Sequence, residues 1–300
     1  MPNFQHSRFL EQDAVNQLLI PRNDALLSEV SVDDLTFSLS KGPFSYYERL
    51  VEITPSPSGA QVTETFTYTI ASPFWRLILG IPIRRFLKRS GGSEEKLWWA
   101  PPEIFDSQTT RTLSLLCIAA VITGYLGALL GQTATFAAEE FGASDRAQGV
   151  LLAMVRIGTL ITVVVAGLAD KHGRKRLLIF SLWSGCAITL LSAASPNIMI
   201  LGISQAMARG FASAISILIG IMAAEAAPKG SRAYIAGILT LTAGLGAGIP
   251  VWLLSLADVH PRGWRLLFLI SFVFFPVIPW LRTQLHESIR FHSHQEAREL

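Results

Sequence analysis

Hydrophobic side chains are distributed very unevenly along this chain of 300 residues. Residues 1–111 mix charged, polar and turn-forming residues, whereas long apolar blocks with almost no charge fill residues 112–281. A helix needs about 20 largely apolar residues to cross the ~30 Å hydrocarbon core of a bilayer. The second part of the chain therefore predicts an integral membrane protein with several spans.

Six apolar blocks are candidates for membrane-spanning helices. The longest uncharged stretch, residues 177–208, exceeds one span, and the turn signal Ser195-Pro196-Asn197 in its middle divides it into two helices. Arg156 and Arg209 are the only charges near the middle of a block. The predicted spans are residues 113–136, 148–169, 177–194, 198–224, 233–257 and 265–281.

Lysine and arginine are concentrated on one side of these spans. The segment before the first span and the loops after the second and fourth carry most of the cations. The opposite loops hold only Arg146, Arg262 and Arg265, together with the acidic residues Glu139 and Glu140. Because basic loops remain in the cytoplasm, we predict a multi-pass protein of the cell membrane with both termini cytoplasmic. No apolar segment opens the chain, so no cleaved signal peptide is expected.

The first hundred residues predict a small α+β region. Residues 44–53 and 60–70 are strand-like, and the second run alternates apolar side chains with threonine, as a half-buried antiparallel strand does. A further strand is expected near Phe37. Residues 74–89 are too short to span and predict either an interfacial helix held by anionic lipid or a helix packed on the sheet. The expected organisation is a cytosolic α+β region (1–100), a six-helix transmembrane bundle (107–284) and the start of a cytoplasmic loop (285–300).

Composition excludes several classes of protein. With 50% hydrophobic and 16% charged residues, the chain does not fit a disordered, collagen-like or disulfide-rich protein. The net charge is only +3, and the basic clusters lie beside apolar segments, so nucleic-acid binding is not expected. Cys117 and Cys186 lie inside apolar blocks and are predicted to be free, buried thiols. We find no catalytic constellation and no metal-ligand spacing, so we predict neither an enzyme nor a cofactor.

The loop between the second and third predicted spans has a distinctive sequence. Residues 167–176 read Gly-Leu-Ala-Asp-Lys-His-Gly-Arg-Lys-Arg. Two glycines permit a very short turn, and Asp170 places a carboxylate at a helix end beside cytoplasmic cations. This sequence resembles the signature loop of the major facilitator superfamily, at the place in the helix order where that family carries it. The alternative is an ordinary basic cytoplasmic loop.

Three further segments resemble the sugar-porter-like members of that superfamily. Residues 225–232 match E-x-x-P-x-x-x-R, residues 263–265 match the G-W-R that opens the sixth span, and residues 287–291 resemble P-E-S-P-R-F without its prolines. The resemblance implies a cytoplasmic ion-pair network that is made and broken during transport. The predicted gate comprises Gly167, Asp170, Gly173, Arg174, Glu225, Arg232, Glu287 and Arg290. The alternative for each charged member is a solvated loop charge of little energetic consequence.

The two mid-depth arginines are candidates for substrate contact. A buried, unpaired arginine is costly, so each should face a partner or a wet cavity, and no carboxylate of the six spans lies at the same depth. We expect Arg156 and Arg209 to line a cavity and attract a small organic anion such as a carboxylate. The alternatives are an acidic partner outside these spans or hydrogen bonds to backbone carbonyls. Additional polar or stacking contacts are predicted for Gln205, Tyr125, Gln132 and Trp252.

The superfamily builds one cavity from two six-helix halves, and the sequence predicts one of them. We therefore expect the amino-terminal half of a longer secondary active transporter, which works by alternating access together with a second six-helix half. With no aspartate or glutamate inside the spans, either proton symport depends on a carboxylate elsewhere or the carrier is a uniporter. The alternative is a six-helix channel or receptor with a cytosolic sensory domain, but neither a pore-lining stretch nor a regulatory motif is present.

Overall fold

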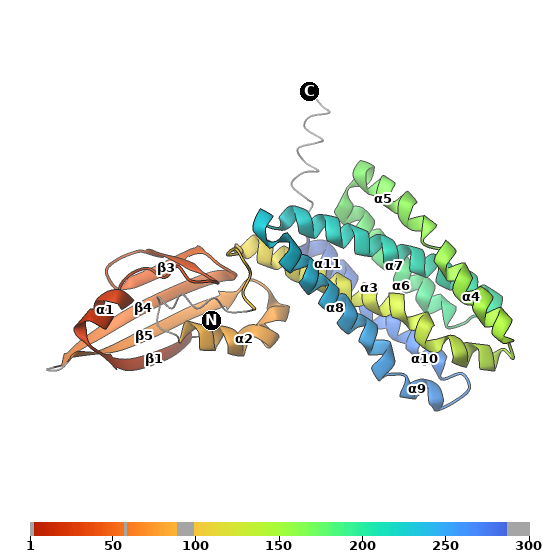
Figure 1. Cartoon of the computed structure of the whole chain (residues 1–300), viewed down its shortest axis with the longest axis horizontal. Helices are drawn as coiled ribbons and strands as arrows, with labels where there is room; N and C mark the ends of the chain where they lie inside the picture. The colour runs from red at the N-terminus through yellow and green to blue at the C-terminus, as the bar shows by residue number, and fades with distance from the viewer. Residues whose placement is uncertain (1–2, 57–58, 89–98, 287–300) are drawn as a thin grey trace, which may run out of the picture. The chain divides into compact units, whose positions relative to one another are not determined.

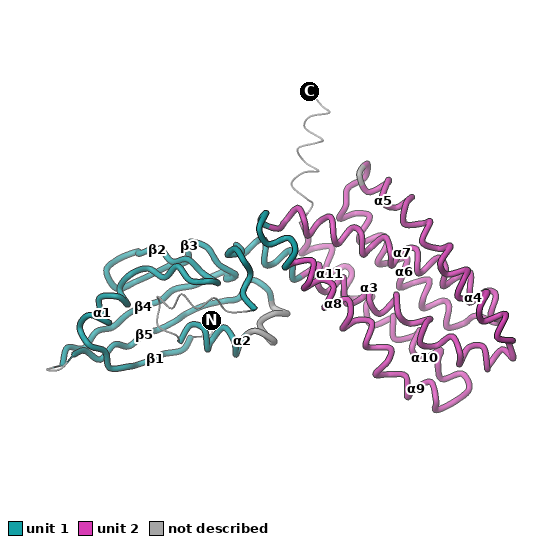
Figure 2. The backbone as a smooth tube through the Cα atoms, viewed as in Figure 1, with its two compact units in different colours: residues 1–114, 228–234 teal, residues 115–227, 235–300 magenta. Residues whose placement is uncertain are grey.

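The chain forms two compact units, which Figure 2 distinguishes by colour. The structure is a computed structural model that describes residues 3–56, 59–88 and 99–286, with the side chains of residues 73–79 and 170 excluded. Unit 1 comprises residues 1–114 and 228–234, and unit 2 comprises residues 115–227 and 235–300. The predicted gate residues Glu287 and Arg290 lie outside the described residues, as does the predicted cytoplasmic loop (285–300) from residue 287 onward.

Unit 1 is built on a five-stranded antiparallel sheet with the order β1-β5-β4-β3-β2 (Figure 1). Its strands are β1 (Asn3–Leu10), β2 (Ser28–Ser31), β3 (Thr36–Lys41), β4 (Phe44–Ser56) and β5 (Gly59–Ile70). In β5 the even-numbered side chains are buried and the threonines lie on the other face, as the alternation predicts. The predicted strands are confirmed, and β1 and β2 are additional to them.

Two helices cover the buried face of the sheet. Val15 and Leu18 of α1 (Gln12–Leu18) share a core cluster with Val51 and Val62. Side chains of α2 (Pro73–Leu87) share a second cluster with the aromatic residues of β1, β4 and β5; they are Ile83, Phe86 and Leu87. Of the two arrangements predicted for residues 74–89, packing on the sheet is therefore the one observed for the second half of α2.

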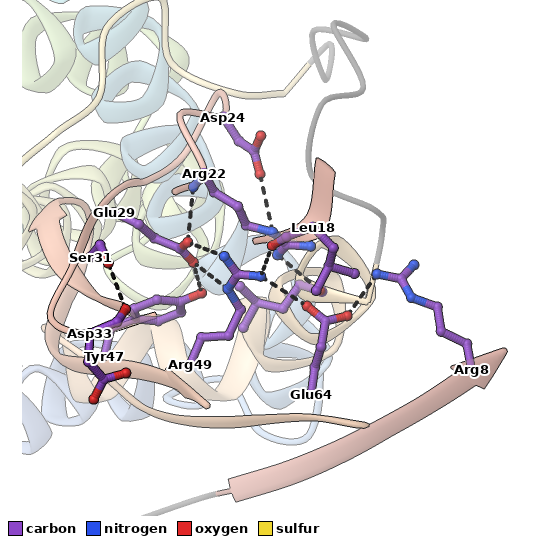
Figure 3. Close-up of polar contacts among 11 residues, drawn as sticks. Arg8, Leu18, Arg22, Asp24, Glu29, Ser31, Asp33, Tyr47, Arg49 and Glu64 are labelled. Carbon is purple, nitrogen blue, oxygen red and sulfur yellow. Dashed lines mark hydrogen bonds and ion pairs between the residues drawn. The ribbon is translucent and has the colours of Figure 1, made fainter. Parts of the chain in front are cut away.

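A network of buried charge lies on the same face of the sheet (Figure 3). Arg49 is 1% exposed and pairs with Glu29 at 2.7 Å and with Glu64 at 3.2 Å. Arg8 binds the other oxygen of Glu64 at 2.7 Å, and the Tyr47 hydroxyl donates to Glu29 at 2.6 Å. Burial, and then the Glu29 carboxylate, raise the pKa of Tyr47 well above its usual range. Buried charges are tolerated when they are paired and hydrogen-bonded in this way.

The membrane-spanning part of the chain is a bundle of helices, most of which lie in unit 2. Among the described residues, six helical segments are long and apolar enough to cross a membrane. They are α3 (Ser107–Glu140), α4 and α5 (Asp145–Ile157 and Leu160–His172), α6 (Arg174–Ser192), α7 (Ile198–Ala226), α8 and α9 (Arg232–Trp252 and Ser255–Asp258), and α10, η2 and α11 (Trp264–Leu269, Ile270–Phe274 and Val277–Gln284). A short helix, η1 (Lys229–Ser231), precedes α8.

The number and order of the spans confirm the predicted fold class, a polytopic all-α membrane protein preceded by a small α+β region. Cys117 and Cys186 are buried and free, as predicted. Helices α3 and α8 touch through their backbones at Gly124 and Gly246. A Cβ on either glycine would meet a backbone carbonyl oxygen of the other helix well inside 3.0 Å, closer than real Cβ atoms come. Small residues permit such crossings in membrane bundles.

Candidate functional site

The loop between α5 and α6 is as short as its sequence predicts. α5 ends at His172, and Gly173 alone joins it to α6, which begins at Arg174. Gly173 has φ 94° and ψ 138°, a conformation that residues with a Cβ rarely adopt. Gly167 is exposed earlier in α5, and Asp170 lies in the last turn of that helix.

Two of the predicted gate residues meet at this end of the bundle. Nη1 of Arg174 forms an ion pair with Oε1 of Glu225, in the last turn of α7. The two side chains are only 18% and 12% exposed. The second carboxylate oxygen of Glu225 is buried and has no hydrogen-bond partner among the described residues. Arg232, another predicted gate residue, is exposed at the start of α8.

The two mid-depth arginines lie beside a crossing of the second and fourth spans. Gly158 and Thr159 interrupt the second span between α4 and α5. A Cβ on Gly158 would collide with the carbonyl oxygen of Ala206 in α7, so the two backbones touch there. Arg156 precedes Gly158 by two residues and Arg209 follows Ala206 by three. Both arginines therefore lie close to this crossing, and the helix break beside them is additional to the prediction.

Both arginines are exposed at the surface of the chain. Nη1 of Arg209 donates a hydrogen bond to the carbonyl oxygen of Gly127 in α3, which is one of the alternatives that the sequence left open. Among the described residues, no carboxylate lies within ion-pair distance of Arg156 or Arg209. A guanidinium has five N–H donors, so the bond to Gly127 orients Arg209 without exhausting its capacity to bind an anion.

The other four substrate candidates divide into two pairs. Gln132 and Trp252 are exposed, the latter by 75%. Tyr125 is fully buried, and its hydroxyl donates to a backbone carbonyl of α10. Gln205 is 2% exposed and its Nε2 donates to the Ser192 hydroxyl at 2.8 Å. The structure therefore places Tyr125 and Gln205 in the packing between helices, because their polar groups are already satisfied there, and not on an open surface.

A polar cluster that the sequence did not predict lies at the opposite end of α6. Glu140, the last residue of α3, accepts hydrogen bonds from Nε1 of Trp264 at 2.7 Å and from Nε and Nη2 of Arg265 at 3.0 Å each. Arg265 also donates to the carbonyl oxygens of Ala193 at 2.6 Å and Ser195 at 2.9 Å. This cluster ties together the end of α3, the end of α6 and the start of α10.

Within unit 1, the segment before α3 binds the loop between α7 and α8. The Glu103 carboxylate accepts from the backbone N–H of Gly230 at 2.9 Å, and the backbone N–H of Glu103 donates to the Ser231 hydroxyl at 3.2 Å. The Tyr234 hydroxyl donates to the carbonyl oxygen of Trp99 at 2.7 Å, and Trp99 packs on the sheet cluster that includes α2. The part of this loop that belongs to unit 1 is therefore held by the segment before α3.

Comparison with known families decides the classification of this bundle. The family model described as Major Facilitator Superfamily matches residues 116–297, which include the Gly173 turn and almost the whole bundle. The chain belongs to the major facilitator superfamily. The resemblance found in the loop at 167–176 is thereby confirmed, and this major facilitator is a multi-pass membrane protein.

This major facilitator is similar to the shikimate transporter of Escherichia coli (strain K12). The two are 27% identical over 205 residues, which cover 59% of this chain and 45% of the relative. A solved structure of a bacterial homolog of the human lysosomal transporter Spinster, inward-facing and unoccupied, matches with a TM-score of 0.53 and 16% identity over 61% of this chain and 44% of that one. At this identity the likeness shows the fold alone. The chain spans less than half the length of the curated relatives it matches.

Proposed function

We propose that this chain forms one half of a secondary active transporter that moves a small organic anion across the cell membrane by alternating access. The observation that carries the proposal is the match of the superfamily model over the six-helix bundle. The similarity to a transporter named for shikimate supports a metabolite as the substrate class. The comparisons give no support to the alternative of a channel or receptor.

Arg209 supports an anionic substrate. A charge at mid-depth requires a partner or water, and the bond from Nη1 to Gly127 holds this exposed guanidinium in one place. The remaining N–H groups match the planar, two-oxygen geometry of a carboxylate. Interrupted helices are typical of transporter binding sites, and the break at Gly158 lies two residues from the second candidate, Arg156. Shikimate, a carboxylate, is therefore the first substrate to test.

A second six-helix half is proposed to supply the opposite wall of the cavity. The second and fifth spans are the least buried of the six, with 22% of their most apolar window buried in each. These spans therefore offer apolar surface to the other half. We infer that the ends of the gate helices at Arg174 and Glu225 face the cytoplasm, because the basic loops lie on that side, and that their ion pair breaks and re-forms as access alternates.

Uptake of labelled shikimate by cells or proteoliposomes that contain the protein tests this proposal. Arg209→Gln is expected to abolish uptake, and Arg209→Lys to reduce it, because a single ammonium replaces a two-pronged contact. Arg146→Gln is the matched control: it removes an exposed arginine from the first turn of α4 and should leave uptake unchanged. Unchanged uptake in a well-expressed Arg209→Gln variant would refute the role of Arg209.

Counterflow distinguishes the classes of membrane protein. A carrier loaded with unlabelled substrate accumulates labelled substrate transiently by exchange, whereas a channel does not. Transport without counterflow would contradict alternating access and favour the channel.

A further inference from the structure

One side of α2 is fixed to the sheet of unit 1. Ile83, Phe86 and Leu87 are buried in the core cluster. Arg22, 4% exposed, donates from Nη1 to the carbonyl oxygen of Leu87 at 3.1 Å, which places a cation at the carboxyl end of the helix. The backbone N–H of Arg22 is in turn held by Glu29 at 2.9 Å, within the network of Figure 3. The buried charges of unit 1 therefore hold α2 in one orientation.

The other side of α2 is exposed and cationic. Arg84, Arg85 and Lys88 are exposed, and Ile81 is 69% exposed beside them. The Arg84 guanidinium lies over the ring of Phe4, with Cζ 5.1 Å from the ring centroid. The sequence of α2 contains no acidic residue. This side, defined by Ile81, Arg84, Arg85 and Lys88, is called the basic face below.

The sheet keeps the acids Glu48 and Glu52 of β4 away from the basic face. Side chains alternate along a strand, and Tyr47 and Arg49 point to the side on which α2 packs. Glu48 and Glu52 therefore lie on the other side, where Glu48 accepts a hydrogen bond from the exposed Tyr46. The cations of the basic face therefore lie on the opposite side of β4 from Glu48 and Glu52.

We propose that the basic face of α2 binds anionic lipid headgroups at the surface of the membrane that the bundle crosses. Cations on a helix attract anionic lipids, and an exposed apolar residue such as Ile81 adds insertion at headgroup level. A bilayer is the occupant because Lys88 lies 19 residues before Ser107, where α3 begins, a reach of at most about 65 Å of extended chain. The lipid surface is therefore always present at high effective concentration.

The proposal is tested on the full chain reconstituted in vesicles. An environment-sensitive fluorophore is attached to Ile81→Cys, while Cys117 and Cys186 are buried. In vesicles with about a third phosphatidylglycerol, we expect blue-shifted emission and quenching by a lipid-attached quencher, both lost at high salt. Arg85→Gln with Lys88→Gln should lower the ratio of bound to unbound helix about 30-fold, since each cation contributes roughly a factor of five.

Matched variants distinguish an effect of the charge on lipid binding from an effect of the substitution on the fold. Lys41→Gln removes an exposed cation from the end of β3 and should leave the signal unchanged, and Arg85→Lys should preserve it. A label that stays in water in phosphatidylglycerol vesicles overturns the proposal. So does a shielded label that is indifferent to lipid charge, which would indicate a protein partner. The proposal depends on membrane insertion but not on the transported substrate, so uptake measured in the same vesicles reports separately on the proposed function.

Discussion

The close backbone contact between α3 and α8 predicts that a single added methyl group destabilises the bundle. In Gly124→Ala, the added Cβ would lie about 1 Å inside the 3.0 Å below which Cβ atoms are essentially never found, measured to the carbonyl oxygen of Ala243. That oxygen belongs to the backbone of a packed helix and cannot rotate aside. The substitution therefore forces the two helices apart.

The expected cost follows from this geometry. Overpacking of a tight site costs about 1–3 kcal/mol. Separation of the helices also weakens the second close contact, between Gly246 and the carbonyl oxygen of Val121, so we expect the upper end of that range. For a bundle of this size, ~3 kcal/mol corresponds to a fall in melting temperature of roughly 6–12 °C.

The assay is the loss of monodisperse protein on heating in detergent, followed by fluorescence-detected size-exclusion chromatography. Gly131→Ala is the matched control, because it lies in the same helix and a Cβ there meets nothing within 4 Å. Alanine favours a helix over glycine by about 1 kcal/mol, so this control should be neutral or slightly stabilised. Equal melting temperatures for the Gly124→Ala and Gly131→Ala variants would refute the reasoning.

Three further predictions concern the polar clusters. Glu140→Gln should destabilise the bundle by about 2 kcal/mol in the same heating assay, because it removes charge-assisted bonds to Arg265; an unchanged melting temperature would contradict it. Burial raises the pKa of Tyr47, so the contribution of this residue to the stability of unit 1 is complete below about pH 10 and is lost as the pH rises further. In urea unfolding above that pH, the free energy of unfolding should therefore fall with rising pH. The Tyr47→Phe variant should not show this fall. Gly230→Ala should displace the flexible Glu103 carboxylate, because the added Cβ would collide with it. Amide hydrogen exchange in the loop between α7 and α8 should then become faster, with little loss of global stability. Unchanged exchange would rule out the hydrogen bond from Gly230 to Glu103.

The spans were predictable because hydrocarbon imposes a simple requirement on composition. Hydropathy detects the part of a helix that lies in lipid but not its continuation into water, so the first span was expected at 113–136 and its helix extends over Ser107–Glu140. The break at Gly158 and Thr159 has no such signature, since the apolar block runs through it. Its position coincides with the backbone contact to Ala206, which only the folded bundle reveals.

The sheet of unit 1 shows where the alternation of apolar and polar residues fails to predict a strand. β4 was predicted as a strand-like run and β5 from its clear alternation, whereas β1 places Phe4, His6 and Arg8 on the inner face. A charged residue there hides the alternation, and it is tolerated only because Arg8 meets Glu64, 56 residues away in the chain. Pairing of this kind depends on strand register, which no local window of sequence contains.

The bundle has two polar clusters, of which the sequence predicted only the first: the Arg174–Glu225 ion pair and the cluster around Glu140. Arg174 and Glu225 were predicted through family resemblance, whereas Glu140 and Arg265 lie 125 residues apart and belong to no pattern that identified their pairing. The two clusters hold the two ends of α6. Arg174 is the first residue of this helix, and the carbonyl oxygen of Ala193, directly after its last residue, accepts a hydrogen bond from Arg265. α6 also packs along α7. Because the far end is held by several hydrogen bonds, rupture of the Arg174–Glu225 pair should displace the end of α7 while the Glu140 cluster stays closed.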